Sequence, residues 1–427
     1  WTYAARAEVR TGITLGKRGP EGIPTAYFGD IIANLYALDA TTGELVWQTS
    51  PDDHHSATLT GTPAFANGNL YVPVSSLEVV TAANPEYACC TFRGHVMAVN
   101  GDDGSVLWDS YAIPNPPIST GDTAAGTKIF APSGAPVWTS PTIDIDLNLL
   151  IFGTGENYSS PADQNSDAVI AVRLDTGERL WSRQTFPDDA WNVACMMVDN
   201  PNCPEEDGPD YDQASSPLLV DIGEGETIVV AGQKDGRVFA LDWETGQNKL
   251  WEVELGRGSI QGGVHFGMAA DGTTVYVPIN DMNDTRNGEW LDPELARPGV
   301  SAVNAVTGEV LWSHVQENVC GEGRPFCDPG VSAAITATDG AVIAGHLDGI
   351  IRIYDRDSGE IIWSYNTTTQ VTGTNGVVAQ GGGMSGSGPA LGAGHMVINS
   401  GYGLYNHEAG NALLVFAPKA TGSVSAR

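Results

Sequence analysis

The chain has 427 residues, of which 20 are basic and 52 acidic, so its formal charge is −32 at pH 7. Such a charge repels phosphate backbones and anionic membranes, and we therefore expect no nucleic-acid partner. The 52 glycines and 25 prolines, beside only 17% charged residues, favour many short strands with tight turns over long helices. No stretch approaches the roughly 18 apolar residues that a membrane-spanning helix needs, so we expect no membrane span.

A short repeat recurs six times along the chain. Each copy has an alternating apolar strand, a turn usually made of Asp or Asn followed by Thr-Gly, and a second strand ending in Trp, a pattern typical of a β-hairpin. Intervening stretches such as residues 60–76 and 215–236 can supply two further strands for each copy, which predicts the four-stranded blades of a β-propeller. The copies cover residues 34–48, 94–108, 168–181, 236–251, 300–312 and 349–363.

The two ends of the chain predict how the propeller closes. Residues 1–7 resemble the last strand of a blade, and residues 410–419 resemble a third strand without its Trp partner. We therefore expect an all-β, single-domain propeller over residues 1–427, with six complete blades and a partial closing blade. A missing N-terminal blade would bring the complete ring to about eight. Alternatively, Trp1 itself completes the last blade, and the ring has seven.

Six cysteines occur as one adjacent pair and two close couples. The even count and the clustering predict three disulfides, and hence an oxidising compartment. Reduced thiols or zinc ligands are the alternative, but no CxxC or HxxxH spacing accompanies them. A ring formed between adjacent cysteines is rarely kept for stability alone, so we expect a functional role for the first pair. The expected pairs are Cys89–Cys90, Cys195–Cys203 and Cys320–Cys327.

The repeat resembles that of quinoprotein dehydrogenases, which hold pyrroloquinoline quinone (PQQ) and Ca²⁺ on the axis of an eight-bladed propeller. Related repeats also occur in outer-membrane assembly scaffolds without a cofactor, so the segments between the repeats must decide the function. The string YACCTFRG, preceded by VSSLE and followed near the C-terminus by Ser-Gly-Tyr-Gly (residues 400–403), resembles polyvinyl-alcohol dehydrogenases more than methanol dehydrogenases.

Residues 58–78 are similar to the family segment whose Thr and Ser bind the PQQ carboxylates and whose Glu ligates Ca²⁺. The resemblance implies these roles for Thr60, Ser76 and Glu78. Few protein ligands are needed, because a hard dication prefers oxygen donors and the quinone supplies part of the shell.

Residues 135–159 resemble the stretch in which a Trp stacks on the PQQ ring and an Asn after Gly-Thr-Gly is a second Ca²⁺ ligand. Trp138 is then the floor of the site. Both Glu156 and Asn157 follow the Gly-Thr-Gly sequence, so either can be the metal ligand. Lys234, in AGQKDG, corresponds to the family cation that faces the quinone oxygens and stabilises developing negative charge.

In methanol-type members a ring of adjacent cysteines covers the PQQ face, but it lies on the preceding blade, where this chain has Arg10. Here Cys89 and Cys90 follow Glu78 instead. The resemblance therefore adds Arg10, Cys89, Cys90 and Arg93 to the residues expected at the cofactor.

The family's catalytic Asp follows a Trp in a D-x-W-D string, whereas the string DDAWN puts Asn192 at that position. An Asn side chain cannot accept the proton of an alcohol. Four loop carboxylates can supply the base instead, namely those of Asp188, Asp189, Asp210 and Asp212. No CxxCH motif occurs, so no c-type haem is attached to this chain.

We therefore expect a PQQ- and Ca²⁺-dependent enzyme that takes hydride from a secondary alcohol, such as a polymeric 1,3-diol, and passes electrons to a separate cytochrome c. One alternative is a non-catalytic scaffold; another is a polymer-binding module that has lost its base, as Asn192 suggests. The enzyme hypothesis predicts that the expected site residues converge at one end of the propeller axis. These are Thr60, Ser76, Glu78, Trp138, Glu156 or Asn157, and Lys234.

Overall fold

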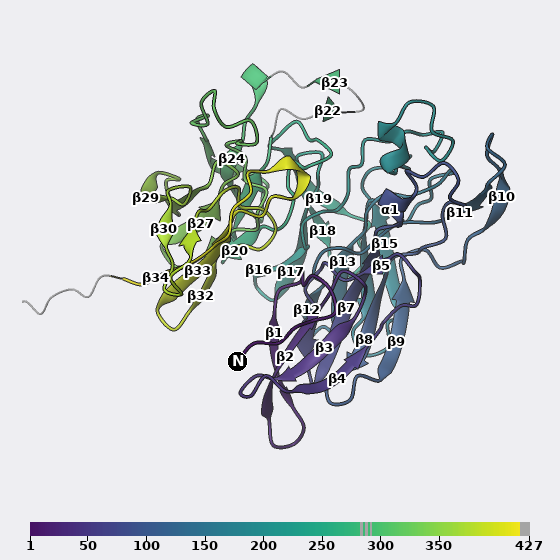
Figure 1. Cartoon of the computed structure of the whole chain (residues 1–427), viewed down its shortest axis with the longest axis horizontal. Helices are drawn as coiled ribbons and strands as arrows, with labels where there is room; N and C mark the ends of the chain where they lie inside the picture. Colours follow the sequence, from purple (N-terminus) through teal and green to yellow (C-terminus); the bar gives the residue numbers. More distant parts are fainter. Residues whose placement is uncertain (282–284, 287–288, 291–292, 419–427) are drawn as a thin grey trace, which may run out of the picture.

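The computed structural model describes residues 1–281, 285–286, 289–290 and 293–418. In this part of the chain, seven antiparallel sheets follow one another in sequence order, each forming one blade (Figure 1). The first six blades have at least four strands and the last has three. The predicted β-propeller, with six complete blades and a partial closing blade, is confirmed.

The blades contain the following strands. Blade 1 has β1 (Thr14–Arg18), β2 (Ile23–Gly29), β3 (Leu35–Asp39) and β4 (Leu45–Thr49); blade 2 has β5 (Ala57–Thr58), β6 (Ala64–Ala66), β7 (Asn69–Ser76), β8 (His95–Asn100) and β9 (Val106–Tyr111). Blade 3 has β12 (Thr142–Asp144), β13 (Leu149–Gly153), β14 (Ala168–Arg173) and β15 (Arg179–Gln184); blade 4 has β16 (Leu218–Gly223), β17 (Glu226–Gly232), β18 (Arg237–Asp242) and β19 (Lys249–Glu254). Blade 5 has β20 (Ala269–Asp271), β21 (Thr274–Ile279), β24 (Gly299–Asn304) and β25 (Val310–Val315). Blade 6 has β26 (Thr336–Ala337), β27 (Ala341–Gly345), β28 (Ile350–Asp355) and β29 (Ile361–Asn366); blade 7 has β32 (Ala390–Gly392), β33 (His395–Ser400) and β34 (Ala412–Phe416).

Short hairpins and helices decorate the loops. The hairpins are β10 (Ile118–Asp122) with β11 (Lys128–Ala131), β22 (Thr285–Arg286) with β23 (Glu289–Trp290), and β30 (Val371–Thr372) with β31 (Val378–Ala379). The helices are α1 (Glu78–Thr81), η1 (Val193–Met196), η2 (Pro293–Leu295) and η3 (Leu404–Asn406). None of the helices in the described ranges has the length and apolar character to cross a bilayer.

The Trp that ends each repeat joins its blade to the next one. The Trp181 indole N–H donates a hydrogen bond of 2.8 Å to the carbonyl of Trp243, in the turn of blade 4. The Trp181 ring also lies where a Cβ on Gly246 would stand, and Gly246 has a φ of +63°. This packing explains why the turn ends in Thr-Gly. The same contact joins Trp1 with Gly43, Trp47 with Gly104, Trp108 with Gly177, Trp251 with Gly308 and Trp312 with Gly359.

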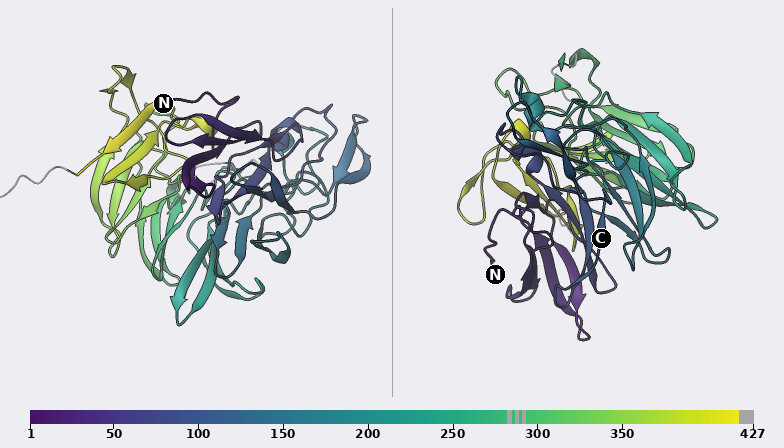
Figure 2. Two further views of the ribbon diagram at one scale, coloured as in Figure 1. Left: turned by 90° about the horizontal axis from the view of Figure 1, so that it is seen from below. Right: turned by 90° about the vertical axis from the view of Figure 1, so that its right-hand side faces the viewer.

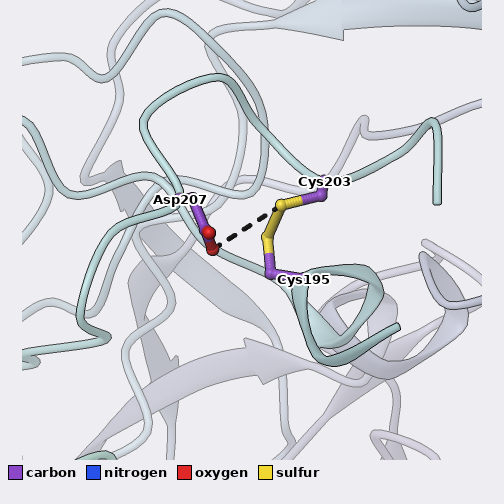
Figure 3. Close-up of side chains that lie close together, drawn as sticks. All are labelled: Cys195, Cys203 and Asp207. Carbon is purple, nitrogen blue, oxygen red and sulfur yellow. Dashed lines mark hydrogen bonds between the residues drawn. A yellow bond between two sulfur atoms is a disulfide. The ribbon is translucent and has the colours of Figure 1, made fainter. Parts of the chain in front are cut away.

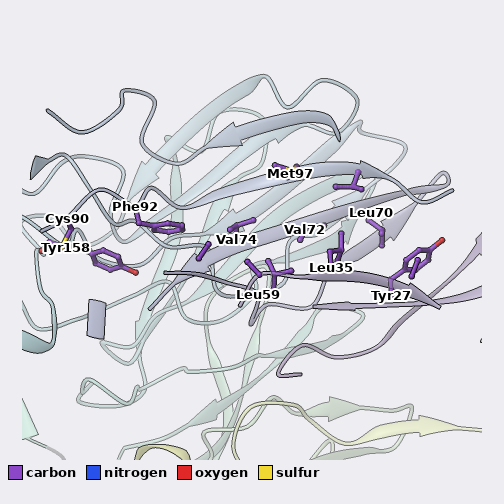
Figure 4. Close-up of a cluster of buried hydrophobic side chains, with 14 of the residues drawn as sticks. Tyr27, Leu35, Leu59, Leu70, Val72, Val74, Cys90, Phe92, Met97 and Tyr158 are labelled. Carbon is purple, nitrogen blue, oxygen red and sulfur yellow. Dashed lines mark hydrogen bonds between the residues drawn. The ribbon is translucent and has the colours of Figure 1, made fainter. Parts of the chain in front are cut away.

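Buried apolar side chains fill the six spaces between successive blades. The cluster between blades 1 and 2 runs from Tyr27 to Phe92, Cys90 and Tyr158 (Figure 4). Among the described residues no comparable cluster joins blade 7 to blade 1. Arg10 nevertheless lies within electrostatic range of Tyr402, and Figure 2 (left) shows the N-terminal segment beside the last blade.

The three predicted disulfides are present, linking Cys89 with Cys90, Cys195 with Cys203, and Cys320 with Cys327. Trp1 does not complete the last blade, whose described strands are β32, β33 and β34 only. Its ring packs instead on the turn of blade 1, the contact that each inner Trp makes with the blade after its own.

Candidate active site

A buried ion-pair cluster lies where loops of blades 3 and 4 meet. Lys234, in the turn between β17 and β18, is 5% exposed. Its ammonium lies 3.0 Å from Asp210 Oδ1 and 2.8 Å from Asp212 Oδ2. Trp138, ahead of β12, donates its indole N–H to the same Asp212 oxygen at 3.0 Å. The Lys234 ammonium is 5.6 Å from the centre of the Trp138 ring, so cation, carboxylates and aromatic face form one unit.

Glu156, in the loop between β13 and β14, belongs to the same cluster. Its backbone N–H donates to Asp212 Oδ1 at 3.0 Å, and its side chain is buried. One carboxylate oxygen each from Glu156, Asp210 and Asp212 lie within 4.8 Å of one another. Burial, followed by the charges of Asp212 and Asp210, raises the pKa of Glu156 well above its ordinary value. Three buried carboxylates beside one ammonium therefore leave a deficit of positive charge.

This donor set fits a hard cation. Carboxylate oxygens are the ligands that Ca²⁺ prefers, and a bound cation would remove the repulsion among the three acids. The half-buried indole ring of Trp138 lies at the edge of the cluster, in T-shaped contact with the rings of His265 and Phe266, whose centroids are each 5.7 Å away. The residues needed for a metal and an aromatic cofactor thus lie together.

Asp189 positions the loop that carries Asp210 and Asp212. Its fully buried carboxylate accepts the backbone N–H groups of Tyr211, at 2.8 Å, and Asp210, at 3.3 Å. Burial raises the pKa of Asp189 to about 6. Asp167 is also fully buried, and neither carboxylate oxygen has a hydrogen-bond partner among the described residues. Burial, with the nearby charge of Asp189, raises the pKa of Asp167 well above its ordinary value.

Glu78, at the start of α1, has a different environment. Its buried carboxylate accepts the backbone N–H groups of Thr91 at 2.9 Å and Phe92 at 2.8 Å, and the Tyr87 hydroxyl at 2.7 Å. The Ser76 hydroxyl accepts the Glu78 backbone N–H at 3.1 Å. Glu78 thus holds the segment that follows Cys89–Cys90, and its oxygens are already bound by donors of this chain.

Tyr158 lies between the two groups of carboxylates. Burial raises the pKa of its phenol well above the ordinary value, and the charges of Glu156 and Glu78 raise it further. The Cys90 sulfur is 4.0 Å from the Tyr158 carbonyl oxygen. The paired cysteines and Glu78 therefore border the same region as Glu156.

Several expected site residues make structural contacts. Asn157 bonds through its side chain to the Ser133 carbonyl and the Asp163 backbone N–H. The Thr60 hydroxyl is 3.5 Å from the Trp138 carbonyl oxygen, next to the cluster.

Both arginines expected at the cofactor have other partners. Arg93 stacks on Tyr111 at 3.8 Å and donates to the carbonyl of Ile113, which directs its guanidinium toward the rim. Arg10 pairs with Glu8 at 2.9 Å in the segment before blade 1, near Tyr402.

The structure does not bring Asn192 to the carboxylate cluster. Its side-chain amide donates to the carbonyls of Tyr158 and Asn202 and accepts the Ala194 backbone N–H, which caps η1. Asp188 is exposed. The insertion of residues 193–209 separates the DDAWN string from Asp210 and Asp212. Sequence spacing alone therefore does not indicate that these two aspartates contact Lys234. The sequence signal for these aspartates is the Asp-Tyr-Asp string in GPDYDQ. It makes Asp210 one of the four loop carboxylates that can serve as the catalytic base.

Comparisons with known proteins concern the sequence and the fold of the chain. Residues 57–257 match the family model described as glucose/ethanol/alcohol dehydrogenase, beta-propeller domain, and residues 166–403 match the model described as outer membrane protein assembly factor BamB. A quinohemoprotein alcohol dehydrogenase structure from Pseudomonas putida is similar with a TM-score of 0.60 at 19% identity, over 88% of this chain and 61% of that one. This structural similarity concerns the fold alone.

Two curated relatives are more similar in sequence. The chain is 34% identical over 430 residues to a polyvinylalcohol dehydrogenase of a Pseudomonas species, covering 98% of this chain and 66% of the relative. It is also 34% identical over 418 residues to a polyvinylalcohol dehydrogenase of a Sphingopyxis species, covering 96% and 63% respectively. The chain thus spans just under two thirds of the length of these relatives. The repeat, the propeller and the near full-length sequence similarity agree, and the chain is similar to quinoprotein alcohol dehydrogenases.

Proposed function

We propose that this propeller oxidises a secondary alcohol with PQQ and a hard cation, Ca²⁺ in the first instance. The observation that carries the proposal is the cluster of Trp138, Glu156, Asp210, Asp212 and Lys234, which come from four loops of the propeller. Residues with unrelated structural roles would scatter over rims and blade faces. Similarity to quinoprotein alcohol dehydrogenases, including two relatives named for polyvinyl alcohol, supports an alcohol as substrate.

Each residue of the cluster has a distinct task. Glu156 and Asp212 would hold the cation, and Trp138 would carry the cofactor ring. The bound quinone would accept the hydride, with the cation polarising its carbonyl. Asp210 is the proposed proton acceptor: its Oδ1 pairs with Lys234, and burial raises its pKa well above the ordinary value although Lys234 opposes the shift. Lys234 pairs with both aspartates, and Asp189 fixes their loop.

Glu78, Ser76, Thr60 and the paired Cys89–Cys90 form the second wall of the proposed site. Arg10, Arg93 and Asn157 have positioning roles at most, because their polar groups are already bound. The proposed substrate class is a secondary alcohol, including the repeating 1,3-diol of a polymer. Electrons would pass to a separate cytochrome c, in a periplasmic or secreted setting consistent with three disulfides.

Metal binding can be measured without turnover. Tb³⁺ is a suitable hard-cation probe, because indole sensitises its luminescence and Trp138 donates to Asp212. We expect saturable Tb³⁺ luminescence that Ca²⁺ displaces, and loss of most of the signal in Asp212→Asn. The exposed variant Asp339→Asn, on the rim of blade 6, should match wild type. An Asp212→Asn protein that binds Tb³⁺ like wild type would contradict the proposed metal ligands.

The chemistry is tested by reconstitution with PQQ and Ca²⁺ followed by dye-linked oxidation of short secondary alcohols. Asp210→Asn should lower turnover by at least about 100-fold, because an amide cannot accept the alcohol proton. Asp339→Asn is again the matched control. Unchanged turnover in Asp210→Asn would eliminate Asp210 as the base.

A second candidate function is a non-catalytic scaffold. The match of residues 166–403 to an assembly-factor model favours it, since that model covers most of blades 3 to 7. A scaffold predicts no cofactor affinity and no effect of Asp212→Asn on PQQ binding. Ca²⁺-dependent PQQ binding that weakens in Asp212→Asn excludes this alternative.

A further inference from the structure

Beside the candidate site, the insertion that follows Asn192 exposes three consecutive apolar side chains. Met196 is 68% exposed, Met197 49% and Val198 93%. Leu77, directly before α1, and Val80 within α1 are also exposed, and α1 contacts η1. We call these five residues the Met-Val patch. Contiguous exposed apolar residues commonly mark an interaction site.

The Met-Val patch is held rigidly outward. The disulfide Cys195–Cys203 closes the loop beneath it, with the Asp207 carboxylate beside the Cys203 sulfur (Figure 3). Because both sulfurs are in the disulfide, this group is no metal site. The Asn202 side-chain amide donates to the carbonyls of Ala82, Asn84 and Tyr87, which fixes the insertion to the loop after α1. The loop that exposes Met196, Met197 and Val198 is therefore fixed in place by a disulfide and by hydrogen bonds.

Both segments that carry the patch also carry exposed carboxylates. Exposed acids in the two segments that carry it are Glu86, Asp199, Glu205 and Asp207. Across residues 77–93 and 190–212 the sole Lys or Arg is Arg93, and its guanidinium binds the Ile113 carbonyl at the rim. Exposed apolar side chains in acidic segments are complementary to a partner whose apolar surface lies among basic side chains.

The patch is also continuous with the proposed catalytic loop. Its insertion begins after Asn192, which donates to the Tyr158 carbonyl, and ends at Asp210 and Asp212. A protein that docks on the patch would lie over the wall formed by Tyr158, Glu78 and Cys90.

We propose that the Met-Val patch is the docking surface for the electron acceptor, a basic c-type cytochrome whose apolar face is surrounded by lysines. This inference rests on the proposed function. Each alcohol oxidised to a carbonyl releases two electrons and two protons, so it reduces two molecules of a one-electron acceptor. The exposed carboxylates of these two segments would add no binding energy for an uncharged polymer. The negative charge therefore favours a basic protein over the polymeric substrate as the partner.

The test uses binding of oxidised mitochondrial-type cytochrome c, a basic probe, measured by calorimetry so that no turnover is required. Val198→Ser removes the apolar contact and should weaken binding about threefold; Val198→Lys adds repulsion and should weaken it at least about tenfold. Raising the salt from about 10 mM to about 200 mM should weaken wild-type binding severalfold. Val377→Lys is the matched control: Val377 is 55% exposed in the β30–β31 hairpin, at the opposite end of the molecule from α1 (Figure 1), and its variant should bind like wild type.

The second measurement separates this inference from the proposed function. Dye-linked oxidation of a short alcohol should be equal in wild type, Val198→Lys and Val377→Lys, whereas cytochrome c reduction should fall only in Val198→Lys. Absence of dye-linked activity in wild type would overturn the proposed function, whereas equal cytochrome c affinity in all three proteins would overturn the docking surface. A Val198→Lys protein with unchanged cytochrome c affinity and a raised KM for polyvinyl alcohol would assign the patch to the polymer and overturn the proposal.

Discussion

Charged residues inside the propeller are tied to specific partners, and His95 is a clear example outside the candidate site. Its fully buried imidazole lies between two carboxylates, with Nδ1 bonded to Asp109 and Nε2 3.1 Å from Asp52 Oδ2. Tyr111 stacks on the ring with centroids 4.8 Å apart. Burial opposes the positive charge, but the bonds to Asp109 and Asp52 prevail and raise the pKa of His95. The imidazolium therefore acts as a structural cation at the root of blade 2.

The raised pKa predicts how stability depends on pH. In the unfolded chain His95 titrates near pH 6.5, so its contribution is complete below about pH 6.5 and declines as the pH rises through the higher folded-state pKa. Glutamine cannot carry the charge, so His95→Gln should lower the free energy of unfolding by about 3 kcal/mol at about pH 6 and by less at about pH 9. Thermal melts across this range measure the difference. The exposed control His395→Gln should leave the profile unchanged, and a pH-independent effect of His95→Gln would contradict the buried imidazolium.

At the scale of the element, the unit of the fold is the hairpin that ends in Trp. In five of the six repeats the Trp faces an Ala across the hairpin, as Trp181 faces Ala171, and in the sixth it faces Ile353. The register shifts directly after this pair in every case. The bulge tilts the outer strand, and in the first five repeats the Trp ring then reaches the Gly of the next turn, whereas Trp363 packs against Phe416 of blade 7. The motif thus links neighbouring blades as well as closing its own hairpin.

Gly246→Ala tests this link. Gly246 has a φ of +63°, and a Cβ there would overlap the Trp181 ring, so the variant meets both a backbone penalty and a steric one. We expect a loss of roughly 2–4 kcal/mol in the free energy of unfolding, measured by denaturant titration. Gly225 has a φ of +80° with no neighbour within 4 Å, so Gly225→Ala carries the backbone penalty alone, about 1 kcal/mol. Equal losses in the two variants would show that the Trp contact adds nothing.

For the molecule as a whole, cohesion comes from the spaces between blades. Each of the six inter-blade clusters seals two sheets against each other, and strands such as β13 and β14 are buried on both faces. Blade 7 shares a cluster only with blade 6, and its β34 exposes Leu413 (69%) and Val415 (60%) on the opposite face. Stability should therefore fall from the central blades toward the last one.

Hydrogen exchange followed by mass spectrometry can measure this gradient. Amides of β13 and β14 should exchange only through global unfolding, whereas amides of β33 and β34 should exchange through local opening, at least about 100-fold faster. Blade 6, sealed on both sides, is the internal control and should resemble blade 3. If amides in blades 3, 6 and 7 were equally protected from exchange, apolar clusters on both faces of a blade would not be the cause of slow exchange.

The sequence alone determined the features that depend on local periodicity. Strand alternation, Thr-Gly turns and terminal Trp residues are contained within about 15 residues each, so they predict the blades, their order and their number in this chain. The three disulfides followed in the same way, since each joins cysteines no more than eight positions apart. Trp138, Glu156 and Lys234 were identified because family motifs surround them.

Only the tertiary structure decided which side chains meet at the candidate site. Trp138 and Asp212 are 74 positions apart, yet they share a hydrogen bond, because the loop before blade 3 meets the loop before blade 4. Spacing placed Asn192 at the position of the base, whereas the insertion of residues 193–209 turns Asn192 into a helix cap and delivers Asp210 and Asp212 to Lys234. The partner of the Glu78 carboxylate likewise depends on tertiary structure, because the segment of Thr91 and Phe92 folds back against it and donates its backbone N–H groups. Periodicity specifies a blade because its contacts are local, but the contents of a shared loop cluster depend on long-range contacts that no local pattern encodes.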